Sequence, residues 1–438
     1  MRHPIHALLA VLATVVLALP TACSGPGDHD DVRGGRRSTQ VDGAGLAGNP
    51  DAPPALAFDP KPAHIIPIGP LEKPPVTLYG RAVWIADEAG LTVVDVRTGK
   101  TVSRVEPKNP PLYDAATPED IENAGEDLIY PVLPPQVGEV DGKRVVLATV
   151  PVRLPAKNAG EPQNGIEVIV VGADDGKPMW RIPVDVYGEP DGHLGAAVWR
   201  PPHDGMAAVQ WTVDGLLTGT FVVDLEERRV LWQRTDFMVV DGYADALVGF
   251  RHEGNDYYAV AGVNLADGTD LWSLPPLERE TSVGGRYEDG YAAGPWTLLS
   301  SEGEPQLIEI ATGRTALSEQ SGLKPGMSCR MRHGGTAVLC ASDADGALAL
   351  SIKTGEVLWQ KPRGEGPDGW TGTVSTTVRD RAYVDRADGP VVIDIRSGTV
   401  VGPNPGIAPD RANAYAGLVF TGTDVEIHLP RGAHGAVS

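Results

Sequence analysis

The sequence has few cysteines, few aromatic residues and little positive charge. Its 438 residues include three Cys and five Phe, and 37 Lys and Arg stand against 58 Asp and Glu, which gives a formal net charge of −21. A protein that binds nucleic acid needs a basic surface to displace the counterions of the phosphates, so the composition argues against that class. An anionic membrane surface would also repel this chain. The acidic surface mainly predicts solubility.

Long apolar runs are lacking except at the N-terminus. Arg2 precedes the run Ala7–Leu19 (ALLAVLATVVLAL), and Pro20-Thr21-Ala22-Cys23 follows it. The run is shorter than the roughly 20 residues of a membrane-spanning helix, so it predicts a signal peptide. The segment before Cys23 resembles a bacterial lipobox, with the small Ala22 in place and Pro20 where Leu is usual. The resemblance implies lipidation of Cys23, and cleavage as an ordinary secretory signal is the alternative.

The composition divides the chain into four segments. Residues 1–22 are the expected signal peptide, and residues 23–62 are rich in Gly, Asp, Pro, Arg and Ala with almost no large apolar side chain. Such a composition cannot bury enough apolar surface to fold, so we expect a disordered tether there. Residues 63–430 have a globular composition, and residues 431–438 form a short tail.

A sequence motif recurs along the globular region. Three and five residues before a turn position every copy is apolar, and the residue between them is mostly polar, which is typical of a half-buried strand. A Gly at the turn supplies the positive φ of a tight hairpin, and Arg228 is the exception that predicts strain or a longer loop. The turn positions are Gly99, Gly176, Arg228, Gly268, Gly313, Gly355 and Gly398, with spacings of 77, 52, 40, 45, 42 and 43 residues.

One hairpin per period of this size predicts the four-stranded blades of a β-propeller. Strand-like segments also lie before the first motif, at Ala63–Ile68, and after the last, at Gly417–Gly422 and Asp424–Pro430. Pairing both chain ends in one composite blade would hide two sheet edges. We therefore predict a single all-β propeller of eight blades closed by its N- and C-terminal strands, with seven blades as the alternative. The first spacing leaves room for an insertion of about 30 residues, which we place within the Pro-rich stretch Glu106–Gln163.

The motif resembles the PQQ-like repeat, and the chain is similar to the BamB-like group of PQQ-repeat lipoproteins. In that family a Trp just after the turn docks between neighbouring blades, and it is matched here by Trp180, Trp232, Trp272 and Trp359. Ser103, Leu317 and Gly402 stand at the same position in other copies. The resemblance implies a monomeric scaffold, lipid-anchored on the outer face of the cell membrane or secreted, without cofactor or catalysis. Its partner would be an envelope or secreted protein, a peptide or a polymer.

Cys329 and Cys340 flank a predicted two-residue turn at Gly334-Gly335. Counting outward from that turn places the two cysteines directly opposite each other on adjacent strands, at a separation that suits a disulfide. An exported protein meets an oxidising compartment, which favours this bond. Two free buried thiols remain an alternative, as does a metal site, although only His333 is near.

The enzyme interpretation stays open as the alternative. PQQ-dependent dehydrogenases resemble this fold but carry two adjacent Cys over the cofactor, whereas the cysteines here are eleven residues apart. A hydrolase or lyase that uses carboxylates in the central funnel is a further possibility, as is an accessory or sensor subunit. The sequence has no Gly-x-Ser-x-Gly elbow and no HExxH motif, so we assign no catalytic, cofactor-binding or metal-binding residue. His193 and His203 lie near Asp191 and Asp204 and are expected on a surface loop.

Overall fold

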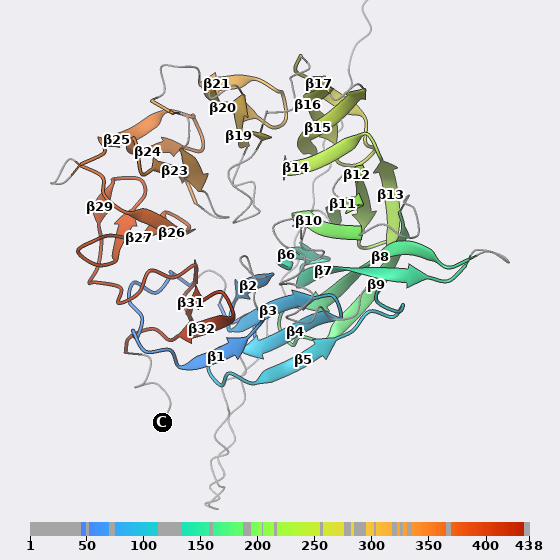
Figure 1. Ribbon diagram of the computed structural model, residues 1–438, viewed down its shortest axis with the longest axis horizontal. Coiled ribbons are helices and arrows are strands. Elements are labelled where there is room, and N and C mark those ends of the chain that lie inside the picture. Colours follow the sequence, from blue (N-terminus) through green and yellow to red (C-terminus); the bar gives the residue numbers. More distant parts are fainter. Residues whose placement is uncertain are drawn as a thin grey trace, which may run out of the picture. The chain divides into compact units, whose positions relative to one another are not determined.

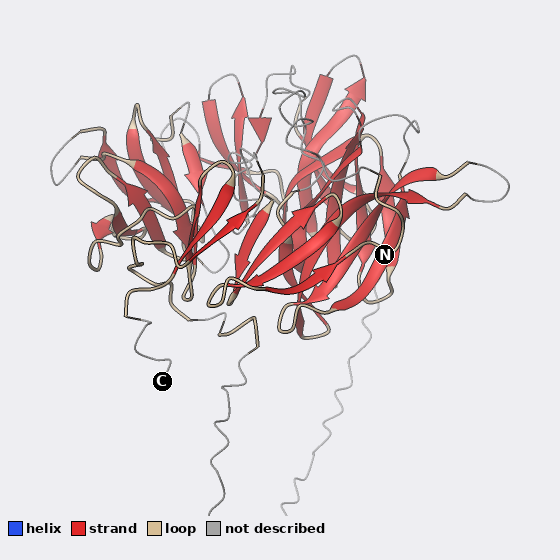
Figure 2. Cartoon of the chain, turned by 60° about the horizontal axis from the view of Figure 1, so that its bottom comes forward, coloured by secondary structure: helices blue, strands red, loops and turns tan. Residues whose placement is uncertain are grey.

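The fold is known from a computed structural model. It describes residues 45–49, 52–69, 75–112, 133–156, 161–186, 194–203, 205–213, 217–254, 257–275, 282–283, 295–301, 304–317, 322–324, 327–330, 335–364 and 369–432. The expected signal peptide, Cys23 and most of the expected C-terminal tail lie outside these ranges. The described elements are all strands (Figure 2), and they include no helix capable of spanning a bilayer.

The strands form eight antiparallel four-stranded sheets, which confirms the predicted fold class and blade number. Seven are built from consecutive strands, and the eighth combines both ends of the chain. Blades 1 to 4 are β2 (Val76–Tyr79), β3 (Ala82–Asp87), β4 (Gly90–Asp95), β5 (Thr101–Val105); β6 (Gln136–Val140), β7 (Lys143–Leu154), β8 (Gln163–Gly172), β9 (Pro178–Asp185); β10 (Leu194–His203), β11 (Met206–Val213), β12 (Leu217–Asp224), β13 (Arg229–Arg234); and β14 (Phe237–Tyr243), β15 (Ala246–Gly254), β16 (Tyr257–Asn264), β17 (Asp270–Ser273). Blades 5 to 8 are β18 (Ser282–Val283), β19 (Trp296–Ser301), β20 (Glu304–Glu309), β21 (Thr315–Leu317); β22 (Ser328–Arg330), β23 (Ala337–Ser342), β24 (Gly346–Ser351), β25 (Val357–Pro362); β26 (Thr373–Val378), β27 (Arg381–Asp385), β28 (Val391–Asp394), β29 (Thr399–Val400); and β30 (Arg411–Ala412), β31 (Gly417–Phe420), β32 (Asp424–His428), β1 (His64–Pro67).

Among the described residues the hydrophobic core forms eight clusters, each lying between two consecutive blades. The series runs from blades 1 and 2 to blades 7 and 8 and ends with a cluster shared by blades 8 and 1, so the ring is closed. Figure 1 shows the blades in chain order around a central axis, with β2, β6, β10 and β14 innermost. Because both faces of each blade are covered, middle strands such as β8 are buried almost throughout.

The composite blade forms as predicted from the two chain ends. β1 pairs with β32 in the antiparallel register His64↔Ile427 to Pro67↔Asp424. β1 is thus the outer strand of blade 8 (Figure 1), and β30 forms the opposite edge of the sheet. The pairing removes the open edge that each terminal segment would otherwise present.

The turn between the third and fourth strands has the expected conformation in all seven repeats. The six turn glycines have φ between 64° and 73°, a region that disfavours side chains. Arg228 takes φ 58° at the same place, between β12 and β13. Having Arg where the other repeats have Gly therefore gives backbone strain and not a longer loop.

The Trp residues after these turns dock on the next blade. In three blades the indole Nε1 donates a hydrogen bond to the carbonyl three residues before the next turn Gly: Trp232 to Leu265 (2.7 Å), Trp272 to Ile310 (2.9 Å) and Trp359 to Ile395 (2.6 Å). The missing Cβ of the turn Gly makes room for the ring, because a Cβ on Gly313 would lie 2.5 Å from Trp272 Cδ2. Trp180 differs: its Nε1 finds no partner among the described residues, and the Arg228 guanidinium lies 5.1 Å from its ring centroid.

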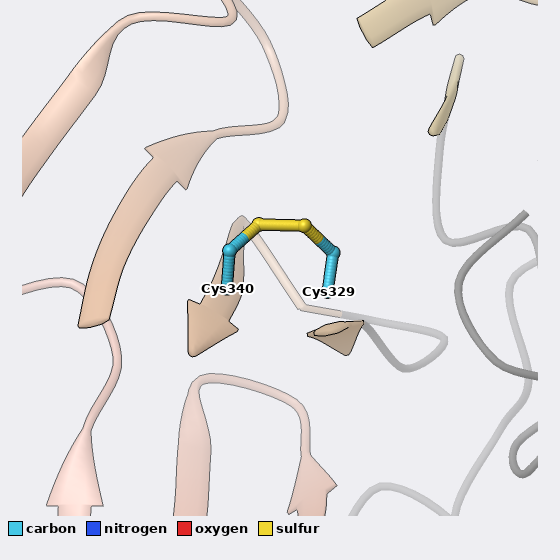
Figure 3. The surroundings of a disulfide bond; sticks show 2 residues. All are labelled: Cys329 and Cys340. Atoms are coloured by element: carbon cyan, nitrogen blue, oxygen red, sulfur yellow. A yellow bond between two sulfur atoms is a disulfide. The ribbon is translucent and has the colours of Figure 1, made fainter. Parts of the chain in front are cut away.

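A disulfide joins Cys329 and Cys340 across the two first strands of blade 6 (Figure 3). The residues are direct partners in the register of β22 and β23, with Cα atoms 3.9 Å apart. This pairing is the one expected from the sequence, and the turn at residues 331–334 lies outside the described ranges.

The folded part begins earlier than the sequence indicates. Residues 45–49 and 52–62, which composition assigned to a disordered tether, pack on the propeller, and Ala47 and Phe58 are fully or almost fully buried. Their few apolar side chains are irregularly spaced, so no strand or helix period marks them. The folded part therefore takes in these residues of the expected tether, and residues 23–44 of it lie outside the described ranges.

Candidate functional site

Blade 2 departs most clearly from the repeat. Its middle strands β7 and β8 pair over ten residue pairs, from Val145↔Gly172 to Leu154↔Gln163, whereas β6 reaches only Lys143–Leu147 of β7. The β7–β8 hairpin therefore extends outward past its neighbours (Figure 1). The end of β7 has no partner from β6, and this free edge is available for another segment.

The start of the linker between β5 and β6 occupies that free edge. Leu112 N donates to Pro151 O at 2.9 Å, Arg153 N donates to Pro110 O at 2.8 Å, and Pro111 and Val152 form a bridge. The predicted insertion within residues 106–163 thus corresponds to this linker together with the long hairpin. Residues 113–132 and 157–160 of it lie outside the described ranges.

A fully buried carboxylate fixes the root of the linker. Glu167 on β8 is 0% exposed and accepts hydrogen bonds from Lys108 N (2.6 Å), Asn109 N (3.1 Å) and Asn109 Nδ2 (2.7 Å). Arg181 Nε lies 3.4 Å from Glu167 and also donates to Glu106 O at 3.0 Å. Burying a charge is costly unless it is paired and hydrogen-bonded, and here both oxygens are used. The carboxylate therefore holds the linker and has little capacity left for a substrate.

The linker returns toward the ring centre at residues 133–136. Leu133 packs on the cluster between blades 3 and 4, and Thr77 Oγ1 donates to Pro135 O at 2.5 Å. Because consecutive strands are antiparallel, this linker and the β7–β8 loop lie on one side of blade 2, and the β6–β7 and β8–β9 turns lie on the other. We call these sides the loop face and the turn face.

An ionic network connects blades 3 and 4. Arg234 donates to both oxygens of Asp236 (2.9 and 2.7 Å) and to Asp270 (2.6 Å), and Arg251 contacts Asp270 and Glu253. The hydrogen bond from Arg234 lowers the pKa of Asp236, and the hydrogen bond to Asp236 raises the pKa of Arg234. Each carboxylate has a cationic partner, so the network stabilises the junction and leaves no free acid or base. The network was not predicted from the sequence, because its members come from β13, β15, β17 and the connection between β13 and β14.

Two carboxylates lie close together where blades 2 and 3 join. The nearby charge of Asp141 raises the pKa of Glu226, with smaller contributions from Asp224 and Glu227. Asp141 has φ 51° in the β6–β7 turn, and Glu226 lies in the turn that also contains Arg228.

The described residues do not fit a quinoprotein site. Cys329 and Cys340 bond across two strands rather than side by side in the chain. No three His, Cys, Asp or Glu side chains among the described residues are grouped so that they could hold a metal ion. Asp345, in the turn between β23 and β24, is hydrogen-bonded to Ser342 at the end of β23 and paired with Lys324, so it is not free to hold a metal ion. His193, Asp191, Asp204 and His333 lie outside the described ranges.

Comparison with known proteins supports the repeat assignment. Residues 258–425, from blade 4 into blade 8, match the model of a PQQ-like repeat family described as outer membrane protein assembly factor BamB. This confirms the PQQ-like, BamB-like character of the repeats in that range. No curated protein matches the sequence.

Several solved structures are similar to this chain. The computationally designed protein Ika8 has 12% identity over 86% of this chain and 99% of its own, with a TM-score of 0.47. BamB from Moraxella catarrhalis has 15% identity over 85% and 98%, with a TM-score of 0.41. A europium-containing methanol dehydrogenase has 10% identity over 82% and 81%, with a TM-score of 0.41.

Proposed function

We propose that this propeller of PQQ-like repeats is an extracytoplasmic scaffold that binds a partner and performs no chemistry of its own. The observation that carries the proposal is the Glu167 anchor, a fully buried carboxylate that fixes the root of the long linker on the loop face. A rigid ring that holds extended loops in place is suited to recognition, since binding loops depend on a fixed framework. The partner we propose is an envelope or secreted protein, a peptide or a polymer.

The location is part of the same proposal. The apolar run Ala7–Leu19 would direct export, and acylation of Cys23 would hold the domain at the outer face of the cell membrane. A net charge of −21 keeps the domain itself off an anionic surface, so a lipid would supply the attachment. The matched family is described as an outer membrane protein assembly factor, and a location in the cell envelope agrees with that description.

Cross-linking in intact cells followed by mass spectrometry tests the scaffold. In one variant residues 113–132 are replaced by a Gly/Ser segment of equal length, which leaves the Glu167 anchor intact. The matched control replaces residues 284–294, which join β18 to β19, in the same way. We expect a reproducible partner that is lost in the first variant and kept in the control. Absence of any reproducible partner, or equal cross-linking in both variants, would contradict the proposal.

Two further measurements test the proposed location and the alternative that the protein is an enzyme. A Cys23→Ala chain should lose membrane association while its thermal unfolding stays unchanged. Stoichiometric quinone or calcium in the purified chain, together with alcohol oxidation, would replace the scaffold by a quinoprotein dehydrogenase.

A further inference from the structure

The N-terminal strap, defined as residues 45–49 and 52–58, crosses four blades on the turn face. Its backbone is bonded to blades 2, 1, 8 and 7 in turn: Leu46 N to Asp174 O (2.7 Å), Arg81 N to Leu46 O (2.6 Å), Asn49 N to Tyr415 Oη (2.5 Å), Ala55 N to Asn413 O (3.1 Å) and Tyr383 Oη to Ala55 O. These blades include the composite blade and both of its neighbours. The strap therefore spans the seam at which the ring closes.

The strap ends in a buried aromatic anchor. Phe58 is 0% exposed and lies in the cluster between blades 7 and 8, with its ring centroid 6.0 Å from that of Tyr383. Phe58 N donates to Pro405 O at 2.8 Å, and Phe58 also forms a bridge with Pro430. A side chain buried to this degree belongs to the core of the fold.

The strap occupies sites from which the repeat Trp is missing. Ser103 and Gly402 stand at the Trp position of blades 1 and 7. Gly176 is the turn onto which a Trp at position 103 would dock, and Ser103 Oγ donates to its carbonyl at 2.6 Å. Leu46 lies beside this short side chain: its Cδ1 would be 3.5 Å from a Cβ on Gly176, and it packs on the core of blades 1 and 2. Leu56 Cδ1 would lie 3.0 Å from a Cβ on Gly402 itself.

The other two junctions without a repeat Trp have their own replacements. At the composite blade, His64 of β1 lies against Gly99, and its Nε2 is 2.9 Å from Arg97 O. In blade 5, Trp296 from β19 donates to Ile352 O at 2.6 Å, the same carbonyl position that the repeat Trp uses elsewhere. Three of the four replacements, at junctions 7/8, 8/1 and 1/2, thus come from the N-terminal segment, and these junctions are consecutive around the seam.

We propose that the N-terminal strap is a lock that holds the ring closed, with Leu56 acting in place of the docked Trp at junction 7/8 and Leu46, beside Ser103, acting in its place at junction 1/2. Closure then depends on two elements, the β1–β32 ladder and the strap. The proposal does not depend on the scaffold function, because it concerns only how the ring is held together.

The first test is hydrogen exchange of the full chain carrying Leu46→Ala. We expect exchange at the Asp174–Gly176 turn to rise about tenfold. Leu271→Ala is the matched control, since Leu271 is 46% exposed on the outer strand of blade 4, and it should leave that turn unchanged. Adding Ser103→Trp to Leu46→Ala restores the repeat residue and should recover most of the protection. Unchanged exchange in Leu46→Ala, or no recovery with Trp at position 103, would overturn the proposal.

The second test addresses the seam. Tyr415→Phe removes the hydroxyl that binds Asn49 and leaves blade 8 intact, so this variant will fold even if Phe58→Ala does not. We expect faster exchange in β1 and β32 and a lower melting temperature in both variants, with the strands of blade 4 unaffected. If Tyr415→Phe exchanges like the unmodified chain in β1 and β32, the strap is a passive covering and the lock is refuted.

Discussion

Replacing Trp232 by Phe tests the docking of one blade on the next. Trp232 Nε1 donates to Leu265 O at 2.7 Å, and Phe keeps an aromatic ring against Gly268 but leaves that carbonyl without its donor. Loss of such a hydrogen bond costs about 1–2 kcal/mol. The smaller ring removes buried apolar area worth about 1 kcal/mol. We therefore expect a total loss of about 2–3 kcal/mol.

Trp180→Phe is the matched control, because Trp180 stands at the same position of the repeat. Its Nε1 has no hydrogen-bond partner among the described residues, so no indole hydrogen bond is lost. The loss of buried area, about 1 kcal/mol, remains, together with a weaker contact between the Arg228 guanidinium and the smaller ring. Both variants remove one Trp and add one Phe, which cancels any general effect of composition.

Urea unfolding followed by circular dichroism compares the two variants. The difference between them should be about 1–2 kcal/mol, with Trp232→Phe the less stable. Hydrogen exchange at Gly268, whose amide donates to Asn264 O at 3.0 Å, locates the loss at the turn of blade 4. Equal losses in the two variants, or a larger loss for Trp180→Phe, would refute the role given to the indole hydrogen bond.

Three further predictions concern single side chains. Reducing the Cys329–Cys340 bond, which closes a loop of sequence separation 11, should lower the free energy of unfolding by about 2–3 kcal/mol, as measured by urea unfolding with and without dithiothreitol. Glu167→Ala leaves the partly buried amides of Lys108 and Asn109 without their acceptor and should cost about 1–3 kcal/mol, with faster exchange at both amides, whereas unchanged exchange would contradict the anchor. The pKa of Glu226 is raised by Asp141, so its protonated form stabilises the fold below the unfolded-state pKa, and that contribution is lost as pH rises through the folded-state pKa. Glu226→Gln should therefore raise the melting temperature at pH 7 and change it little near pH 3, and an equal effect at both pH values would exclude the repulsion.

The repeated hairpins were predictable because their signal is local. Alternating apolar residues and a turn Gly predict the third and fourth strands of each blade, and the even spacing of these hairpins predicts that the blades form a ring. The disulfide was predictable for the same reason, since Cys329 and Cys340 belong to one hairpin. The composite blade followed from two strand-like chain ends whose edges needed partners.

The strap and the Glu167 anchor were not predictable, because their partners lie far away in the sequence. Leu46 packs against Gly176 and Phe58 against Tyr383, and neither strap residue lies in a periodic pattern. Glu167 looks like an ordinary polar residue of a strand until the linker returns to cover it. Trp296 takes the place of the Trp that is missing at position 317, but it comes from β19 and not from the repeat position. The repeat pattern therefore does not predict this contact.

The pairing of β1 with β32 has a consequence for biogenesis. The first described strand to be synthesised is the last to find its partner, because it pairs with the last described strand, Asp424–His428. Until then the partly synthesised chain exposes two unpaired edges, which are the surfaces that aggregate or recruit chaperones. A truncated chain that lacks β32 would leave β1 without its partner and the ring open. The ring can therefore close only after β32 has been synthesised.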